Sequence, residues 1–219
     1  MVELDQRSKN RMVLLLIAGI PVTMILAASW LWYFVARGEL DLVGALGTAN
    51  SGTLVQPPRQ LDDVQLLDDA GFEVRYAELE PKWTMLVPVQ GARCNAACEE
   101  KLYVTRQIHV AMGKEFNRLR RLYVSDVPAG DTALAVTALS DDGAAPVRLD
   151  QLLSSEHRGT VALHTQSQNI DNLFPERQTE PSTWYLVDPA GWIMMSYDQS
   201  VTYKDVISDL KFLLKNSSE

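Results

Sequence analysis

The chain has 219 residues, of which 47% are hydrophobic and 22% charged, and these ordinary proportions exclude a disordered or fibrous protein. Its net charge at pH 7 is −8, with 28 Asp and Glu against 20 Lys and Arg. Nucleic acid is excluded as a partner, because phosphate contacts need clustered Lys and Arg. The length suits one domain of about 100–150 residues and an additional segment.

An uncharged stretch, residues 12–36, reads MVLLLIAGIPVTMILAASWLWYFVA and follows an N-terminal tail, residues 1–11. A bilayer core needs about 20 apolar residues, so the stretch is predicted to be a transmembrane anchor. Trp30, Trp32 and Tyr33 lie near its end, where aromatic rings favour the headgroup layer. A cleaved signal peptide is the competing interpretation. The apolar run continues past the small residues LAAS, however, and exceeds the about 7–15 residues of a signal sequence, which favours the anchor.

The charges on the two sides of the span predict its orientation. Arg7, Lys9 and Arg11 precede it, whereas Glu39 and Asp41 follow it. Because positive residues remain on the cytoplasmic side, we expect a cytoplasmic N-terminus and an exported C-terminal part. In a bacterium this is a single-pass inner-membrane protein with a periplasmic domain.

Residues 37–60 are rich in Gly, Thr and Pro and have no sustained apolar period. They are predicted to be a tether that leads to a domain at residues 61–219. The exported residues 38–219 carry 16 Lys and Arg against 26 Asp and Glu, a net charge of −10.

The domain alternates strand-like and helix-like patterns. Strands are predicted at 83–89 (WTMLVPV), 121–127, 160–165, 183–188 and 192–198, and helices at 98–119, 149–157 and 203–215. Strand–helix alternation that ends in a hairpin indicates an α/β fold, a mixed sheet with helices on both faces.

Cys94 and Cys98 are the only cysteines of the chain, and they lie between the strand at 83–89 and the helix that follows. A structural disulfide is one interpretation, since exported proteins fold in an oxidising compartment. So short a loop removes little entropy from the unfolded chain, however. Cysteines four apart in one helix are also too distant to bond. The pair closes only if Cys94 lies just outside the helix, which favours a labile redox switch over a structural crosslink.

Two chemistries are open to this pair. The free N–H groups at a helix start and the charge of Arg93 would stabilise a thiolate, although Glu99 and Glu100 oppose this effect. Dithiol–disulfide exchange would use Cys94 as the more exposed, attacking thiol and Cys98 as the resolving thiol. Two close thiolates are equally a soft ligand pair suited to Cu(I). The spacing alone leaves both chemistries open.

The segment KWTMLVPVQGARCNAAC, residues 82–98, resembles the Sco family of copper and thiol proteins, which help to assemble cytochrome c oxidase. Members have one N-terminal membrane helix and a C-x-x-x-C motif after an apolar strand. The similarity covers about residues 56–216. A second segment, PSTWYLVDPAGWI at 181–193, resembles a run found in periplasmic thioredoxin-like proteins. The resemblance implies a thioredoxin-like fold and makes Pro181 the cis-proline that faces the cysteines.

The resemblance also implies copper as the metal, with Cys94 and Cys98 as ligands, and oxidase subunits or assembly factors as partners. The family's third copper ligand is a histidine, which we place at the position of Pro189, and proline cannot ligate. His164 is then the candidate third ligand. It ends a strand two strands from the cysteines, about 10 Å away at about 4.8 Å per strand.

Three functions remain as alternatives. The first is copper handling at the oxidase copper centre through the C-x-x-x-C pair. The second is a dithiol–disulfide oxidoreductase that keeps oxidase cysteines reduced, which would make the chain an enzyme; the missing histidine favours it. The third is a non-catalytic assembly scaffold.

Overall fold

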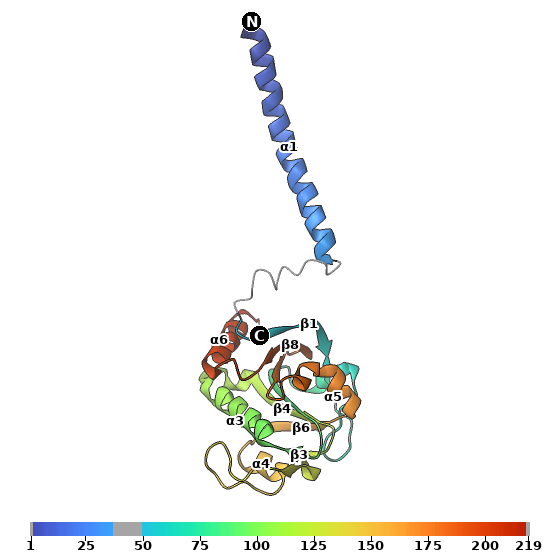
Figure 1. Ribbon diagram of the computed structural model, residues 1–219, viewed down its shortest axis with the longest axis vertical. Coiled ribbons are helices and arrows are strands. Elements are labelled where there is room, and N and C mark those ends of the chain that lie inside the picture. Colours follow the sequence, from blue (N-terminus) through green and yellow to red (C-terminus); the bar gives the residue numbers. More distant parts are fainter. Residues whose placement is uncertain (1, 37–49, 218–219) are drawn as a thin grey trace. The chain divides into compact units, whose positions relative to one another are not determined.

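The computed structural model describes residues 2–36 and 50–217, and the chain divides into two units, Met1–Ala49 and Asn50–Glu219. The first unit contains helix α1, Val2–Ala36 (Figure 1). Its segment Leu15–Phe34 has a mean hydropathy of 1.9 and is, within the described ranges, the one helix long and apolar enough to cross a membrane. It coincides with the predicted anchor at 12–36.

The second unit is an α/β domain with a six-stranded mixed sheet in the order β1-β8-β7-β2-β4-β6 (Figure 1). Its strands are β1 (Thr53–Gln60), β2 (Trp83–Val89), β4 (Leu119–Ser125), β6 (Thr160–His164), β7 (Trp184–Val187) and β8 (Trp192–Tyr197). Strands β2, β4 and β6 are parallel, whereas β7, β8 and β1 each run antiparallel to their neighbour in the order β2-β7-β8-β1. Two short segments, β3 (Arg93–Cys94) and β5 (Ala133–Leu134), form a separate parallel pair.

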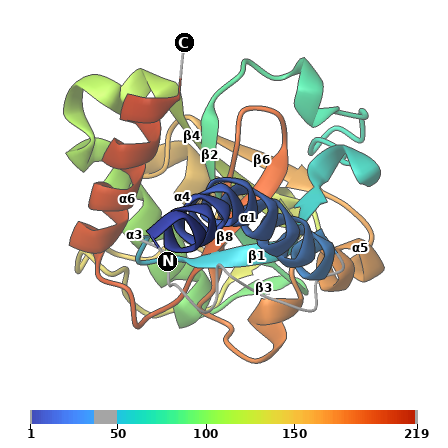
Figure 2. The same cartoon turned by 90° about the horizontal axis from the view of Figure 1, so that it is seen from above.

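Helices cover both faces of the sheet. They are α3 (Ala96–Ala111), α4 (Leu149–Ser155), α5 (Ser167–Leu173) and α6 (Tyr203–Asn216), with 3-10 turns η1 (Leu61–Asp63), η2 (Tyr76–Glu78), η3 (Gly113–Arg118), η4 (Ala129–Asp131) and η5 (Pro175–Gln178). Helices α3 and α6 lie together on one side and α5 lies on the other (Figure 2). The predicted mixed sheet flanked by helices is therefore confirmed.

The core consists of two apolar clusters, one on each face of the sheet. Met85 of β2 packs in the cluster of α3 and α6, which includes Leu102 and Leu210. The next residue, Leu86, packs in the cluster of Ile170 from α5. Successive side chains of a strand point to opposite faces, so the unbroken apolar run of β2 reflects burial on both sides.

The predicted helix at 98–119 is shorter than expected. Helix α3 ends at Ala111, and Gly113 follows with a φ of 57°. Glycine adopts this left-handed conformation without a steric penalty and commonly terminates helices. The rest of the predicted helix is the 3-10 turn η3.

The predicted tether at 37–60 is wrong for its last part, because residues 53–60 form β1, the edge strand beside β8. Only Val55 of this strand is buried, and its register shifts between Leu54 and Arg59, around Pro57 and Pro58. Proline is tolerated on edge strands and at bulges, which explains why the segment has no apolar period. Residues 37–49 lie outside the described residues.

Asp209 of α6 fixes the point where the chain enters the domain. Its buried carboxylate accepts hydrogen bonds from the N–H groups of Ser51 (2.9 Å) and Gly52 (3.1 Å) and from the hydroxyl of Tyr197 (3.2 Å). A Cβ atom at Gly52 would lie 2.6 Å from the Tyr197 ring. The close approach therefore requires glycine.

Candidate functional site

Cys94 and Cys98 form a disulfide, with Cα atoms 5.2 Å apart. Cys94 belongs to β3, and Cys98 lies in the first turn of α3. Asn95 between them has an extended backbone and caps the helix, since its Oδ1 accepts the N–H of Cys98 at 3.1 Å. Cys94 therefore lies outside the helix, as closure of so short a loop requires.

Both cysteines are buried. Cys94 is 0% exposed and Cys98 3% exposed, and both belong to the apolar cluster beneath α3. The expectation that Cys94 is the more exposed thiol is therefore wrong. A segment distant in the sequence pairs with this stretch: Ala133 N–H donates to the carbonyl of Ala92 (2.9 Å), and Ala135 N–H donates to that of Cys94 (2.8 Å). Its Leu134 and Leu139 belong to the same apolar cluster as the cysteines. We call residues 133–140 the cover segment.

Glu99 holds the far end of the cover segment against α3. Its carboxylate is 4% exposed and accepts hydrogen bonds from the backbone N–H and the hydroxyl of Ser140. A groove of about 670 Å³ runs between α3 and this segment, and Ala96 and Leu139 are among its lining residues. The groove borders the helical turn of Cys98, but neither cysteine lines it. We therefore expect access to the sulfurs to require movement of the cover segment.

Replacing Glu99 with alanine should accelerate reduction of the disulfide by dithiothreitol by at least about tenfold. The two hydrogen bonds involve a carboxylate and contribute about 1.5–3 kcal/mol each, and each 1.4 kcal/mol removed from local opening is about a tenfold larger open population. Stopped-flow thiol detection measures the rate. The matched control is Glu100→Ala, which removes a neighbouring exposed carboxylate. Equal rates for Glu99→Ala and the unmodified chain would show that the cover segment does not limit access.

The helix start offers less thiolate stabilisation than the sequence predicts. The N–H of Cys98 is bound to the Asn95 side chain, and the N–H of Glu99 donates to the Asn95 carbonyl at 2.9 Å. Of the N–H groups in this first turn, only those of Ala96 and Ala97 remain free to donate a hydrogen bond to a thiolate sulfur. Arg93 is exposed and has no ion pair within the described part of the chain.

Lys101, which is not among the predicted site residues, is a buried cation one helical turn beyond Cys98. Its Nζ donates to the carbonyls of Pro88 (3.1 Å) and Pro181 (2.9 Å), and the side chain forms no ion pair among the described residues. Burial, with a smaller effect of Arg177, lowers the pKa of Lys101 to about 8. Its only sequence signal is its spacing from Cys98 on the inward face of α3.

The stability of the chain should rise by about 2 kcal/mol between pH 7 and pH 9.5 because of Lys101. Its pKa of about 8 in the folded state lies below the ordinary 10.5, so the unfolded chain binds more protons across this window, and the free energy of unfolding increases with pH. Urea unfolding at several pH values measures the slope. Lys101→Met should remove the slope, whereas Lys204→Met, an exposed control, should retain it. A slope that persists in Lys101→Met would contradict the assignment.

The prediction that Pro181 is a cis-proline is wrong. Among the described residues, the one cis peptide bond joins Gln56 and Pro57. Pro181 occupies the second position of a tight turn, in which Thr183 N–H donates to the carbonyl of Glu180 at 3.0 Å. Trans proline suits this position because its φ is fixed near −65°. The contribution of Pro181 to the region is its carbonyl, which accepts from Lys101.

The structure also corrects the role given to Pro189. Val187 pairs with Thr84, so the β7–β8 turn that carries Pro189 lies at the start of β2. Cys94 follows the opposite end of that strand. Residue 189 therefore lies at the opposite edge of the sheet from the cysteines, and the predicted third-ligand position does not lie beside them.

His164 lies at the edge of the sheet where β2 ends and leads to the cysteines. Val89 of β2 pairs with Ser125 of β4, which pairs with His164 of β6. The imidazole Nδ1 is buried and has no hydrogen-bond partner. Within residues 2–36 and 50–217, there is no group of three or more His, Cys, Asp or Glu side chains that could hold a metal ion. The three-ligand site of Cys94, Cys98 and His164 therefore stays a prediction.

A mixed sheet of this order, with a C-x-x-x-C pair where β2 passes into α3, defines a thioredoxin-like domain. Residues 83–217, more than half of the chain, match the family described as "transmembrane-like, thioredoxin-like, C-terminal domain". The chain belongs to this family.

Solved structures with the same fold include Sco proteins. Copper-bound Sco1 of yeast has a TM-score of 0.52 and 17% identity, covering 78% of this chain and 97% of its own. Apo Sco1 of Thermus thermophilus has a TM-score of 0.51 and 17% identity, with coverages of 76% and 99%. Copper-bound ScoI of Arabidopsis thaliana has a TM-score of 0.50 and 14% identity, with coverages of 76% and 99%. The resemblance to the Sco family is thus confirmed at the level of the fold. No curated protein matches the chain.

Proposed function

We propose that the chain is a membrane-anchored, Sco-like protein whose reduced Cys94–Cys98 pair carries Cu(I) to the copper centre of cytochrome c oxidase. The observation that supports this is the sulfur pair at the β2–α3 junction, in a fold shared with Sco1 structures that hold copper. Helix α1 would hold the chain in a bacterial inner membrane, with the N-terminus in the cytoplasm and the domain in the periplasm. Oxidase subunits or assembly factors would be its partners.

The chemistry starts from the closed disulfide. An external dithiol attacks one sulfur, the S–S bond breaks, and the dithiol leaves as its own disulfide while two cysteine thiols remain. Cu(I) then binds both sulfurs and releases their two protons. Soft thiolates are well matched to Cu(I), and His164 would supply a third ligand if the end of β6 and the two cysteines approach each other after reduction.

The test is a Cu(I) titration of the reduced full-length chain in detergent against a chromophoric chelator. We expect one Cu(I) per chain and none for the oxidised chain. His164→Ala should weaken binding if the imidazole is a ligand, whereas His157→Ala removes a histidine that is paired with Arg121 elsewhere in the domain. No binding at micromolar Cu(I) would exclude the copper function.

Dithiol–disulfide exchange is the second candidate, and two observations favour it. The sulfurs are already bonded, and the described residues contain no assembled group of metal ligands. Exchange with an oxidase cysteine needs only the two sulfurs and a route of access. Cys94→Ala and Cys98→Ala should each trap a mixed disulfide if the remaining thiol attacks. Neither variant would trap a partner if the chain performs no exchange.

The burial of both cysteines favours the third candidate, a non-catalytic assembly scaffold. A scaffold would tolerate loss of both sulfurs. Oxidase assembly in cells that carry the Cys94→Ala, Cys98→Ala chain distinguishes this function from the first two: normal assembly supports the scaffold, and failed assembly supports a role for the thiols.

A further inference from the structure

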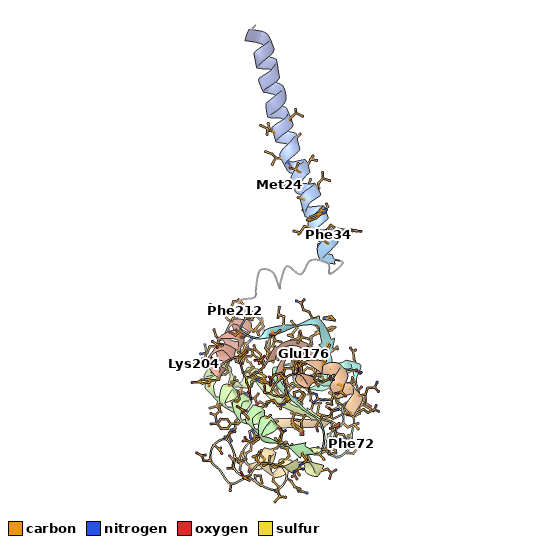
Figure 3. The ribbon with its side chains drawn as sticks, viewed as in Figure 1. Met24, Phe34, Phe72, Glu176, Lys204 and Phe212 are labelled. Atoms are coloured by element: carbon orange, nitrogen blue, oxygen red, sulfur yellow. A yellow bond between two sulfur atoms is a disulfide. The ribbon has the colours of Figure 1, made fainter. Side chains whose placement is uncertain are left out.

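Helix α6 carries a stripe of lysines on its outer face. Lys204, Ser208, Lys211 and Lys215 are spaced by four, three and four residues, which places them on one side of a helix. All are exposed, and Phe212 beside them is 60% exposed. Figure 3 shows Lys204 and Phe212 on the outer side of the helix, away from the sheet. We call these five residues the α6 stripe.

The α6 stripe is positively charged on an acidic domain. None of its three lysines forms a salt bridge among the residues that the structure describes. Of the two acids of the helix, Asp209 is buried, and Asp205 is an exposed carboxylate in the first turn, so it offsets charge beside Lys204 and not beside Lys211 and Lys215. The exported residues have a net charge of −10, so unpaired cations concentrated on one helix face indicate an anionic partner.

The stripe lies on the helix beside which the chain enters the domain, which makes a lipid surface the partner that we consider. Asp209 on the same helix binds the N–H groups of Ser51 and Gly52, so the chain enters the domain beside α6. Residues 37–49 alone connect it to the end of α1. Thirteen residues at about 3.5 Å each reach at most about 45 Å, so the covalent link limits the distance between the start of the domain and a membrane that holds α1.

We propose that the α6 stripe rests on anionic lipid headgroups of the membrane that anchors the chain. The lysine ammonium groups would bind lipid phosphates, and the Phe212 ring would enter the boundary between headgroups and acyl chains. The contact would orient the domain and direct other faces, including the groove beside Cys98, toward partners. The proposal requires α1 to be a membrane anchor and is independent of the chemistry of the cysteines.

Lysine acetylation with mass spectrometry tests the contact on the full-length chain in lipid nanodiscs. Because an anionic surface stabilises each nearby lysine by about 1 kcal/mol, we expect Lys204, Lys211 and Lys215 to react about fivefold more slowly in discs with phosphatidylglycerol than in discs of phosphatidylcholine. Lys114, whose side chain is 92% exposed on η3, is the internal control and should react equally in both. At 1 M salt, where the screening length is about 3 Å, the difference should vanish.

A pair of phenylalanine variants distinguishes insertion of the Phe212 ring into the lipid from electrostatic attraction of the lysines alone. Phe212→Ser should increase acetylation of the three lysines in anionic discs, whereas Phe72→Ser should not, although Phe72 is 71% exposed (Figure 3). Equal reaction of the stripe lysines in the two lipids would overturn the proposal. So would equal slowing of Lys114, which would show a general effect of the charged disc. Protection that appears only after an acidic protein is added would assign the stripe to a protein partner instead.

Discussion

The Cys94→Ala, Cys98→Ala chain is expected to bind no Cu(I) and to form no mixed disulfides, while keeping its fold. These residues are the only thiols, so both proposed chemistries lose their reacting atoms. The disulfide closes a loop of a few residues, and its loss should cost only about 2 kcal/mol of unfolding free energy. Chelator competition measures the copper, and urea unfolding measures the stability.

Two comparisons make this result interpretable. Met194→Ala removes a thioether sulfur and should leave Cu(I) binding intact. The reduced, unmodified chain should match the double variant in stability, because both lack the S–S bond. Copper binding by the double variant at the affinity of the reduced chain would mean that other groups hold the metal.

Asp209→Ala should lower the free energy of unfolding by about 3–5 kcal/mol, because hydrogen bonds to a carboxylate contribute about 1.5–3 kcal/mol each and the buried donors would lose their acceptor. Those donors are the N–H groups of Ser51 and Gly52 and the hydroxyl of Tyr197. The variant should also release the residues that precede β1, seen as faster amide exchange there than in the rest of the sheet.

The matched control for this prediction is Asp205→Ala on the same helix. Asp205 bonds to the exposed N-cap Thr202, and we expect a loss of about 1 kcal/mol or less, as is typical at helix starts. If Asp209→Ala costs no more than Asp205→Ala, the carboxylate does not hold the start of the domain in place.

The sequence was informative where one segment dictates its own structure. The apolar run of β2, the hairpin of β7 and β8 and the amphipathic α6 were all predicted close to their observed bounds. Strand β1 was missed because an edge strand with two prolines and one buried residue has no period of its own. Its place is fixed by pairing with β8, which lies more than a hundred residues later.

The candidate site was predicted only in part for the same reason. The closure of Cys94 with Cys98 follows from local geometry at the helix start. They are buried in an apolar cluster that includes Leu134 and Leu139 of the cover segment, a segment bonded to Glu99. Pro181 is trans and lies in a tight turn, and its carbonyl accepts a hydrogen bond from the distant Lys101. None of these pairings leaves a periodic signal in the sequence.

The reduction potential of the Cys94–Cys98 disulfide, measured by equilibration with glutathione or dithiothreitol, tests the central claim most directly. Structural disulfides have potentials below about −300 mV, whereas regulatory or catalytic ones lie higher. We expect a midpoint above that value, with near-ultraviolet circular dichroism unchanged on reduction. A midpoint well below it, or loss of the folded signal when the bond opens, would show that the two sulfurs hold the domain together and do not change state in its function.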